Sequence, residues 1–254
     1  MTGRVAIIGL GPGDDRYLTR EACDMLDAAD TLFGYGPYLD RVPARDGQTR
    51  HGSDNRKEGT RAEAALRQAA QGASVAIVSG GDPGVFAMAA SVCEAIETGP
   101  EAWRALDIAI VPGITAMLAV AARAGAPLGH DFCALSLSDN LKPWELIERR
   151  LEAAVSAGFV IALYNPVSRA RPWQLAKALA LLSRHLPDGT PVIFGRAVGR
   201  PDESVTVTPL VSAGDIAADM ATLIIVGSSE TRVIARDGRS PLVYTPRAVE
   251  KVSA

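Results

Sequence analysis

Short apolar runs rich in β-branched residues alternate along the chain with stretches in which apolar residues recur at helical spacing. The runs that predict buried strands are VAIIG, SVAIVS, DIAIV, FCALSLS, FVIALY, PVIFGR and TLIIVG. The spacing between them predicts helices over Arg20–Ala29, Val85–Ile96, Thr115–Ala124, Trp144–Ala157 and Trp173–His185. Nearly continuous apolar strands separated by helices are typical of a parallel sheet covered on both faces.

The pattern is interrupted at ARAGAPLGHD, residues 122–131, where small residues, a proline and glycines follow one another. This composition predicts a linker between two α/β domains, the first over residues 1–123 and the second over residues 124–254. After Gly195 the strands come closer together, and the dipeptide Asp237-Gly238 predicts a hairpin with antiparallel pairing in the second domain. The expected fold class is therefore α/β.

Composition narrows the class of protein further. The 254 residues are 48% hydrophobic and 22% charged, as in an ordinary globular protein, and the net charge of −3 argues against general attraction to nucleic acid. The most apolar stretch is too short to span a bilayer and contains Arg123. The three cysteines are isolated, which fits a reducing compartment, and a strand predicted from Val5 leaves no room for a secretory leader. We expect a cytoplasmic protein without nucleic-acid or membrane partners.

The first strand runs directly into glycines, in GLGPGDD, residues 9–15. A dinucleotide-binding fold needs G-x-G-x-x-G with the helix starting inside the motif. Here the third glycine comes one residue early, and the first good helix N-cap is Thr19. The spacing therefore argues against a dinucleotide phosphate loop, and the chain carries no G-x-x-x-x-G-K-[ST] motif either.

Two later strands also end in glycine-bearing turns, SGGDPGVF at residues 79–86 and VPGITAML at residues 111–118. Asp82 is expected to cap the helix that follows, with Pro83 in its first turn. A turn with no further role remains an alternative for this stretch. Since parallel strands end at one edge of a sheet, the three turns should converge where open α/β sheets bind ligands. None carries a lysine, so the ligand would be held by backbone and small side chains.

Taken together, GLGPGD, GGDP, PGITA and TLIIVG resemble, in order and spacing, the tetrapyrrole (corrin/porphyrin) methylases, which use S-adenosylmethionine. The resemblance covers essentially the whole chain. Within that family, SLSDNLKPWELIERRL, LYNPVSRARPWQL and FGRAVGRPDE are similar to the branch of precorrin-3B C17-methyltransferases, which serve cobalamin biosynthesis and also contract the macrocycle.

The resemblance implies a homodimer of two α/β domains with the cofactor in a cleft between them, the class III type of S-adenosylmethionine-dependent methyltransferase. A tetrapyrrole would be the substrate, and S-adenosylhomocysteine would be the product of the cofactor. The matched motifs imply cofactor contacts at Pro12, Gly80, Gly81, Asp82, Val85, Phe86, Thr115, Ala116, Asn165, Ala197 and Thr222.

A polycarboxylate macrocycle should meet arginines and aromatic rings. The segment Arg41–Arg61 is basic and poor in apolar residues, and we expect it to form a mobile flap that binds substrate through Arg45, Arg50 and Lys57. A solvated loop with ordinary surface charge is the alternative. Tyr35 and Tyr38 could line the macrocycle or pack in the core, and Arg196 is a candidate clamp for a substrate carboxylate.

The loop SDNLKPW, residues 138–144, is the candidate for the chemistry of this branch, since it leaves a buried strand and enters a helix. Ring contraction requires removal of a hydroxyl proton, for which Asp139 is the candidate base, with Lys142 as an acid or carboxylate anchor and Ser138 beside them. His51 could move protons. The alternative is that Asp139 shapes a turn and that Lys142 and His51 are solvated.

Two other functions are the alternatives. Another member of the family, acting at a different ring carbon or on a cobalt-containing ring, would share the cofactor motifs. A nucleotide-binding oxidoreductase or sensor belongs to a different class, which the glycine spacing disfavours. The histidines and cysteines share no metal-ligand spacing, so we expect no bound metal and no iron–sulfur centre.

Overall fold

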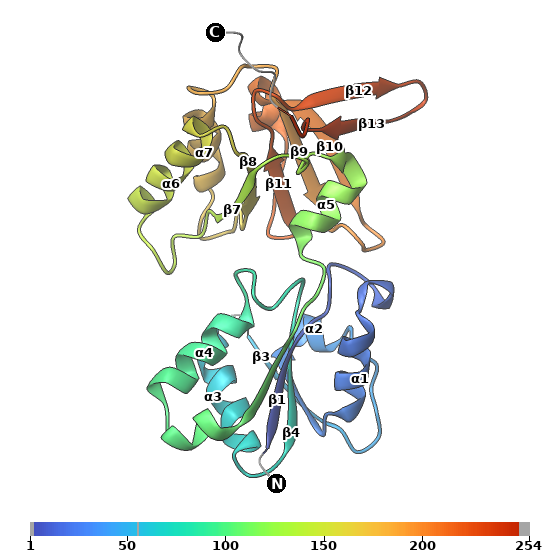
Figure 1. Ribbon diagram of the computed structural model, residues 1–254, viewed down its shortest axis with the longest axis vertical. Helices are drawn as coiled ribbons and strands as arrows, with labels where there is room; N and C mark the ends of the chain where they lie inside the picture. Colours follow the sequence, from blue (N-terminus) through green and yellow to red (C-terminus); the bar gives the residue numbers. More distant parts are fainter. Residues whose placement is uncertain (1–2, 55, 249–254) are drawn as a thin grey trace. The chain divides into compact units, whose positions relative to one another are not determined.

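A computed structural model describes residues 3–54 and 56–248. The chain folds into two compact units, Met1–Thr115 and Ala116–Ala254 (Figure 1). The division precedes helix α5 (Ala116–Ala124), whereas the linker expected from the sequence follows most of that helix. The helix belongs to the second unit because Met117, Val120 and Ala124 pack into a core cluster of that unit.

The first unit contains a five-stranded sheet in which every pair of neighbours is parallel, as predicted. The strand order is β3-β2-β4-β1-β5. The strands are β1 (Arg4–Gly9), β2 (Thr31–Tyr35), β3 (Thr49–Ser53), β4 (Ser74–Ser79) and β5 (Asp107–Val111). Because the strands are parallel, all five end at the same edge of the sheet.

Helices cover both faces of this sheet (Figure 1). In β1, Val5 and Ile7 belong to one core cluster with residues of α3 and α4, whereas Ile8 belongs to a second cluster with residues of α1. This alternation explains why the strand is apolar throughout. The helical segments are α1 (Arg20–Ala28), α2 (Gly36–Leu39), α3 (Glu58–Ala69) and α4 (Met88–Thr98), with 3₁₀ turns at Asp15–Tyr17 and Glu101–Ala105.

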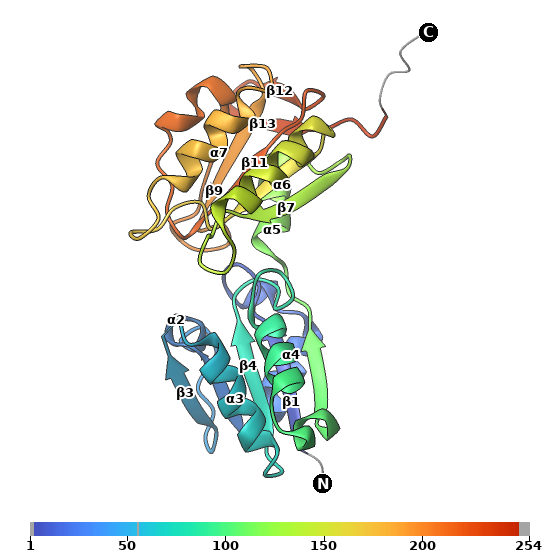
Figure 2. The same ribbon diagram turned by 90° about the vertical axis from the view of Figure 1, so that its left-hand side faces the viewer.

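The stretch from β2 to α3 was not recognised from the sequence, and the expected flap over Arg41–Arg61 is wrong. Residues 49–53 form β3, the edge strand of the sheet (Figure 2), and α3 begins at Glu58. The strand is TRHGS, with no buried residue, so it carries no hydrophobic signal. Backbone pairing with β2 holds it in place.

The second unit contains a mixed five-stranded sheet of order β10-β9-β11-β8-β7. The strands are β7 (Phe132–Ser136), β8 (Val160–Tyr164), β9 (Pro191–Arg196), β10 (Ser204–Pro209) and β11 (Thr222–Val226). Only β7 and β8 pair in parallel, and the other pairs are antiparallel. Residues of α6 (Trp144–Ser156) and α7 (Gln174–Leu182) share one core cluster with this sheet, and residues of α5 share the other (Figure 1).

The predicted hairpin is confirmed. Strands β12 (Arg232–Arg236) and β13 (Arg239–Tyr244) pair antiparallel around Asp237 and Gly238, with Gly238 at φ 64°. Strand β6 (Gly125–Ala126) adds to β13, and a 3₁₀ turn at Leu210–Asp215 follows β10. Within the described residues, no helix is both long enough and apolar enough to cross a membrane.

Candidate active site

The three glycine-bearing turns of the first unit meet at the carboxyl edge of its sheet, as expected. They follow β1, β4 and β5, and they carry the candidate cofactor residues Pro12, Gly80, Gly81, Asp82, Val85, Phe86 and Thr115. Gly11 and Gly81 exchange two backbone hydrogen bonds of 3.1 and 2.9 Å. A Cβ atom at Gly113 would overlap the carbonyl of Gly81 and lie 2.9 Å from the Cα of Gly9. Glycine is therefore required so that the backbones can touch.

Asp82 joins two of these turns, and its expected role as a helix cap is wrong. Its carboxylate accepts hydrogen bonds from the backbone N–H of Gly84 at 2.8 Å and of Gly113 at 3.1 Å. Helix α4 begins later, at Met88, and no side chain caps it. The carboxylate thus connects the turn after β4 to the turn after β5.

Aromatic rings pack against the turn after β4. A Cβ atom on Gly80 would lie 2.6 Å from Cζ of Tyr38, so the ring occupies the space that a side chain would need. Tyr35, at the end of β2, makes an edge-to-face contact with Tyr38, with ring centroids 5.4 Å apart. Both tyrosines therefore lie at the same edge as the glycine turns.

The first glycine turn does not lead directly into a helix. Helix α1 begins at Arg20, and the side chain of Thr19 caps it by accepting a hydrogen bond from the N–H of Ala22 at 3.0 Å. The helix N-terminus is thus separated from the end of β1 by residues 10–19. This geometry is not that of a dinucleotide-binding fold, in which the helix starts at the glycines.

Three non-glycine residues of the described chain have a left-handed backbone: Phe86 at φ 53°, Asn165 at φ 53° and Ala197 at φ 48°. All three are among the residues matched to cofactor contacts. This conformation costs a non-glycine residue about 1–2 kcal/mol and is concentrated at functional sites. Phe86 is also half exposed, which is unusual for a phenylalanine.

The arginines expected to bind substrate from a flap instead hold the chain to itself. Arg45 donates to the backbone carbonyls of Asp27 and Ala29, the latter at 2.7 Å. Arg50 donates to the carbonyls of Val42 at 2.9 Å and of Pro43. Neither arginine is presented as a free clamp.

A third arginine of this segment, Arg41, supports the turn after β1. Its Nη2 atom donates to the carbonyls of Leu10 at 2.6 Å and of Gly11 at 3.0 Å. Arg41 therefore organises the candidate cofactor turn by binding its backbone.

His51 and Lys57 belong to strand β3 and to the segment between β3 and α3. The ring of His51 stacks on Phe33 within the sheet, with centroids 4.7 Å apart, because the two residues are register partners in β3 and β2. Lys57 is exposed and precedes α3. Both side chains belong to the first unit, whereas Ser138, Asp139 and Lys142 belong to the second.

One edge of the second sheet collects the remaining candidates. Strands β7, β8 and β9 end at this edge, and the antiparallel β11 begins there, since Ser136 pairs with Tyr164 and Arg196 with Thr222. The loops at this edge carry Ser138, Asp139, Lys142, Asn165, Ala197 and Thr222. Ala116, the first residue of this unit, begins α5.

Polar contacts connect two of these loops. Both carboxylate oxygens of Asp139 accept a hydrogen bond from Nε2 of Gln174 at 3.1 Å. The hydroxyl of Ser136 accepts from Nδ2 of Asn165 at 3.0 Å and from the N–H of Ser138 at 3.3 Å. The loop after β7 is therefore held to the loop after β8, with Asp139 oriented by a buried amide.

Lys142 lies in the same loop and is half-buried. Burial, and then repulsion by Arg150, lower the pKa of its ammonium group below the ordinary value of 10.5. A lysine with a lowered pKa gives up its proton more readily, which suits a proton donor.

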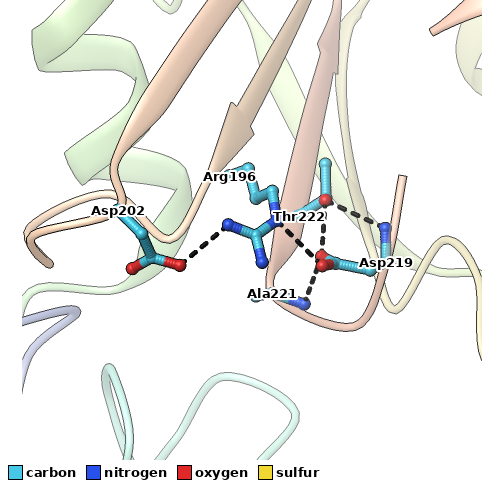
Figure 3. Close-up of polar contacts among 5 residues, drawn as sticks. All are labelled: Arg196, Asp202, Asp219, Ala221 and Thr222. Carbon is cyan, nitrogen blue, oxygen red and sulfur yellow. Dashed lines mark hydrogen bonds and ion pairs between the residues drawn. The ribbon is translucent and has the colours of Figure 1, made fainter. Parts of the chain in front are cut away.

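Arg196, expected as a substrate clamp, is already paired inside the chain (Figure 3). Its guanidinium donates to Asp202 at 2.8 Å and to Asp219 at 2.9 Å. Asp219 also accepts from the hydroxyl of Thr222 and from the N–H of Ala221, both at 2.9 Å. The network fixes the strand ends that carry Ala197 and Thr222, so the structure gives Arg196 a positioning role.

Sequence reasoning missed Gln174 and Asp219 as parts of the site. Each acts on a residue far away in the chain, and no local pattern marks such a contact. The structure also shows no cluster of histidine, cysteine and acidic side chains suited to a metal ion within residues 3–54 and 56–248.

Known proteins share this sequence and architecture. Residues 4–214 match the profile of the family described as Tetrapyrrole (Corrin/Porphyrin) Methylases. The chain is 61% identical over 247 residues to the precorrin-3B C(17)-methyltransferase of Sinorhizobium sp, covering 97% of both proteins. It is 40% identical over 246 residues to a probable cobalt-factor III C(17)-methyltransferase of Salmonella typhimurium, covering 96% of this chain and 98% of that protein.

A solved structure agrees. The crystal structure of the methyltransferase CobJ superposes with a TM-score of 0.91 at 48% identity, covering 96% of this chain and 100% of that one. The match to the profile spans most of the chain, and the two relatives match nearly all of it. The chain therefore belongs to the tetrapyrrole (corrin/porphyrin) methylase family of methyltransferases.

Proposed function

We propose that this protein transfers a methyl group from S-adenosylmethionine to C17 of precorrin-3B, with contraction of the ring to precorrin-4, in cobalamin biosynthesis. The observation that carries the proposal is the 61% identity, over nearly the full length of both chains, to a precorrin-3B C(17)-methyltransferase. The loops after β7, β8 and β9, which carry the motifs of that branch, lie together at one edge of the second sheet.

The residues present fit the cofactor. The glycine turns of the first unit bring three backbones into contact without side chains, and the left-handed residues Phe86, Asn165 and Ala197 are all in positions matched to the cofactor. When bound, S-adenosylmethionine supplies a methyl group activated by its sulfonium. The protein then has to orient the two reactants, since no nucleophile of its own is needed.

The loop after β7 is the proposed source of acid–base groups. Asp139 accepts the proton that ring contraction releases, and Gln174 orients its carboxylate. Lys142 donates a proton or holds a substrate carboxylate, and Ser138 lies beside them in the same loop. Tyr35 presents an aromatic face for the macrocycle at the edge of the first sheet. We further propose that the enzyme works as a cytoplasmic homodimer.

A second candidate substrate is the cobalt-containing ring at the corresponding stage. The 40% identity to a probable cobalt-factor III C(17)-methyltransferase favours it as the alternative. Both names place the methyl group at C17, so the substrate that the enzyme turns over distinguishes the two candidates.

The experiment is incubation of the purified protein with S-adenosylmethionine and metal-free precorrin-3B, followed by mass and absorption spectra. We expect a mass gain of one methyl group with a changed chromophore. If the protein turned over cobalt-factor III but not precorrin-3B, the assigned substrate would be the cobalt complex. Turnover of neither, with intact binding of S-adenosylhomocysteine, would overturn the assignment to C17.

A further inference from the structure

Arg171 is a buried cation without an acidic partner among the residues that the structure describes. Its side chain is 8% exposed, and its Nη1 atom has no hydrogen-bond partner. Its Nη2 atom reaches the sulfur of Met220, 3.8 Å away, which is a weak acceptor. None of the ion pairs formed by the described residues includes Arg171. Burying a charge in this way costs free energy that the fold does not recover.

Another buried arginine of the same chain is satisfied. Arg61 is 4% exposed, and its guanidinium donates to the hydroxyl of Ser53 at 2.9 Å, the carbonyl of Asp54 at 2.8 Å and the sulfur of Met88 at 3.2 Å. At Arg61 the fold therefore provides acceptors for a buried guanidinium. Among the described residues, Arg171 has only the weak sulfur acceptor of Met220, which favours a partner from outside the chain.

Arg171 lies near the candidate cofactor and catalytic residues of the second unit. The residue lies in the loop after β8, which begins with the left-handed Asn165 and ends at Gln174, the partner of Asp139. Met220, which its guanidinium approaches, lies between the paired Asp219 and Thr222 at the start of β11. The unsatisfied charge therefore lies among the loops that carry the cofactor and catalytic candidates.

Further unused polar atoms belong to these loops. The Oε1 atom of Gln174 and the Nε1 atom of Trp144 are buried without hydrogen-bond partners in the described part of the chain. Trp144 contacts Trp173, two residues after Arg171, with ring centroids 4.9 Å apart. One orphaned atom could be an accident of packing, but three from adjoining segments indicate a place prepared for a polar group.

We propose that Arg171 binds a carboxylate of a ligand of this enzyme, either a peripheral carboxylate of the tetrapyrrole or the methionine carboxylate of the cofactor. The inference rests on the proposed function, which supplies both ligands. A guanidinium matches a carboxylate with two parallel hydrogen bonds, and such a pair is strongest in a buried place.

The test compares Arg171→Met with Arg169→Met, which removes an equal charge from an exposed position of the same loop. Affinities for S-adenosylhomocysteine and for 5′-methylthioadenosine, which lacks the amino-acid carboxylate, are measured by calorimetry. The KM for precorrin-3B and the free energy of unfolding are measured alongside. Arg169→Met should match the wild type in all four.

If the tetrapyrrole is the source, Arg171→Met raises KM by about tenfold or more and leaves both nucleoside affinities unchanged. If the cofactor is the source, Arg171→Met weakens S-adenosylhomocysteine but not 5′-methylthioadenosine. In either case the variant should be at least as stable as the wild type, since an unpaired buried charge has been removed. Unchanged KM and affinities, or a lowered stability with equal loss for both nucleosides, would overturn the proposal.

Turnover of precorrin-3B by the wild type tests the proposed function separately from the role of Arg171. If the wild type does not turn over precorrin-3B, uroporphyrin III, a stable polycarboxylate tetrapyrrole, replaces it as a binding probe followed by absorption. Weaker binding of that probe or of S-adenosylhomocysteine by Arg171→Met alone would still support the carboxylate site, and equal binding by all proteins would reject it.

Discussion

The carboxylate of Asp82 accepts a hydrogen bond from the backbone N–H of Gly113, 31 residues further along the chain, at 3.1 Å. The same carboxylate accepts from Gly84 at 2.8 Å. Through these bonds one side chain sets the spacing of two turns at the edge of the first sheet. The relationship makes Asp82 a structural tie of the candidate cofactor site.

Replacing Asp82 should therefore disturb both the fold and the site. Asp82→Ala removes both acceptors, and we expect a loss of about 1–3 kcal/mol in the free energy of unfolding, with weaker binding of S-adenosylhomocysteine. Asp82→Asn keeps one acceptor oxygen and should lose less. Chemical denaturation and calorimetric titration measure the two effects.

The control for this pair is Asp46→Ala, which removes an exposed carboxylate outside the turns. If Asp82→Ala were as stable as the control and bound the nucleoside equally well, the tie would have no energetic role.

Gly113 tests the contact between the turn backbones. A methyl group at this position would overlap the carbonyl of Gly81, so Gly113→Ala should destabilise the first unit by about 1–3 kcal/mol and reduce affinity for S-adenosylhomocysteine. The matched control is Gly59→Ala in α3, where a Cβ atom would meet nothing within 4 Å. That change should leave affinity intact and stabilise the helix by about 0.5–1 kcal/mol. Equal behaviour of the two variants would contradict the argument.

Asp219 should make the free energy of unfolding depend on pH in the acid range. Burial alone would raise the pKa of its carboxyl, but hydrogen bonds from Thr222, Arg196 and Ala221 outweigh burial and lower the pKa below its ordinary value of 3.8. A lowered pKa in the folded state means that the contribution is complete above about pH 4 and is lost as the pH falls through the lowered pKa.

Asp219→Asn should accordingly be less stable than the wild type at neutral pH, with the difference shrinking below about pH 4. Unfolding by denaturant over this pH range measures it. If the difference in free energy of unfolding between Asp219→Asn and the wild type stayed constant down to the lowest pH, Arg196 and Thr222 would not stabilise the charged form of Asp219.

Lys142 should act on the tetrapyrrole and not on the cofactor. Lys142→Met should raise the KM for precorrin-3B or lower kcat by about tenfold or more, while the affinity for S-adenosylhomocysteine stays within about twofold. Burial and Arg150 lower the pKa of Lys142 below its ordinary value of 10.5. Activity that depends on the charged ammonium should therefore fall, as the pH rises, at a pH lower than 10.5. Lys142→Arg keeps the charge and should move the upper limb of the pH profile to higher pH. A large loss of nucleoside affinity in Lys142→Met would show that the loop serves the cofactor instead.

The sequence by itself determined the α/β class, the parallel first sheet, the hairpin at Asp237-Gly238 and the meeting of the glycine turns. These features follow from local periodicity and from the rule that parallel strands end together, so distant contacts are not needed to infer them. The family also followed from the sequence, because the order of short motifs is preserved along the whole chain.

Only the tertiary structure decided how the polar side chains are used. Asp82 ties two turns instead of capping a helix, Arg50 holds the chain's own carbonyls, and Arg196 is paired with two carboxylates. Arg171, a residue of the same type, is left buried without an acidic partner among the described residues. A charged residue looks the same in a sequence whether its partner is the chain or a ligand, because the partner is brought to it by folding.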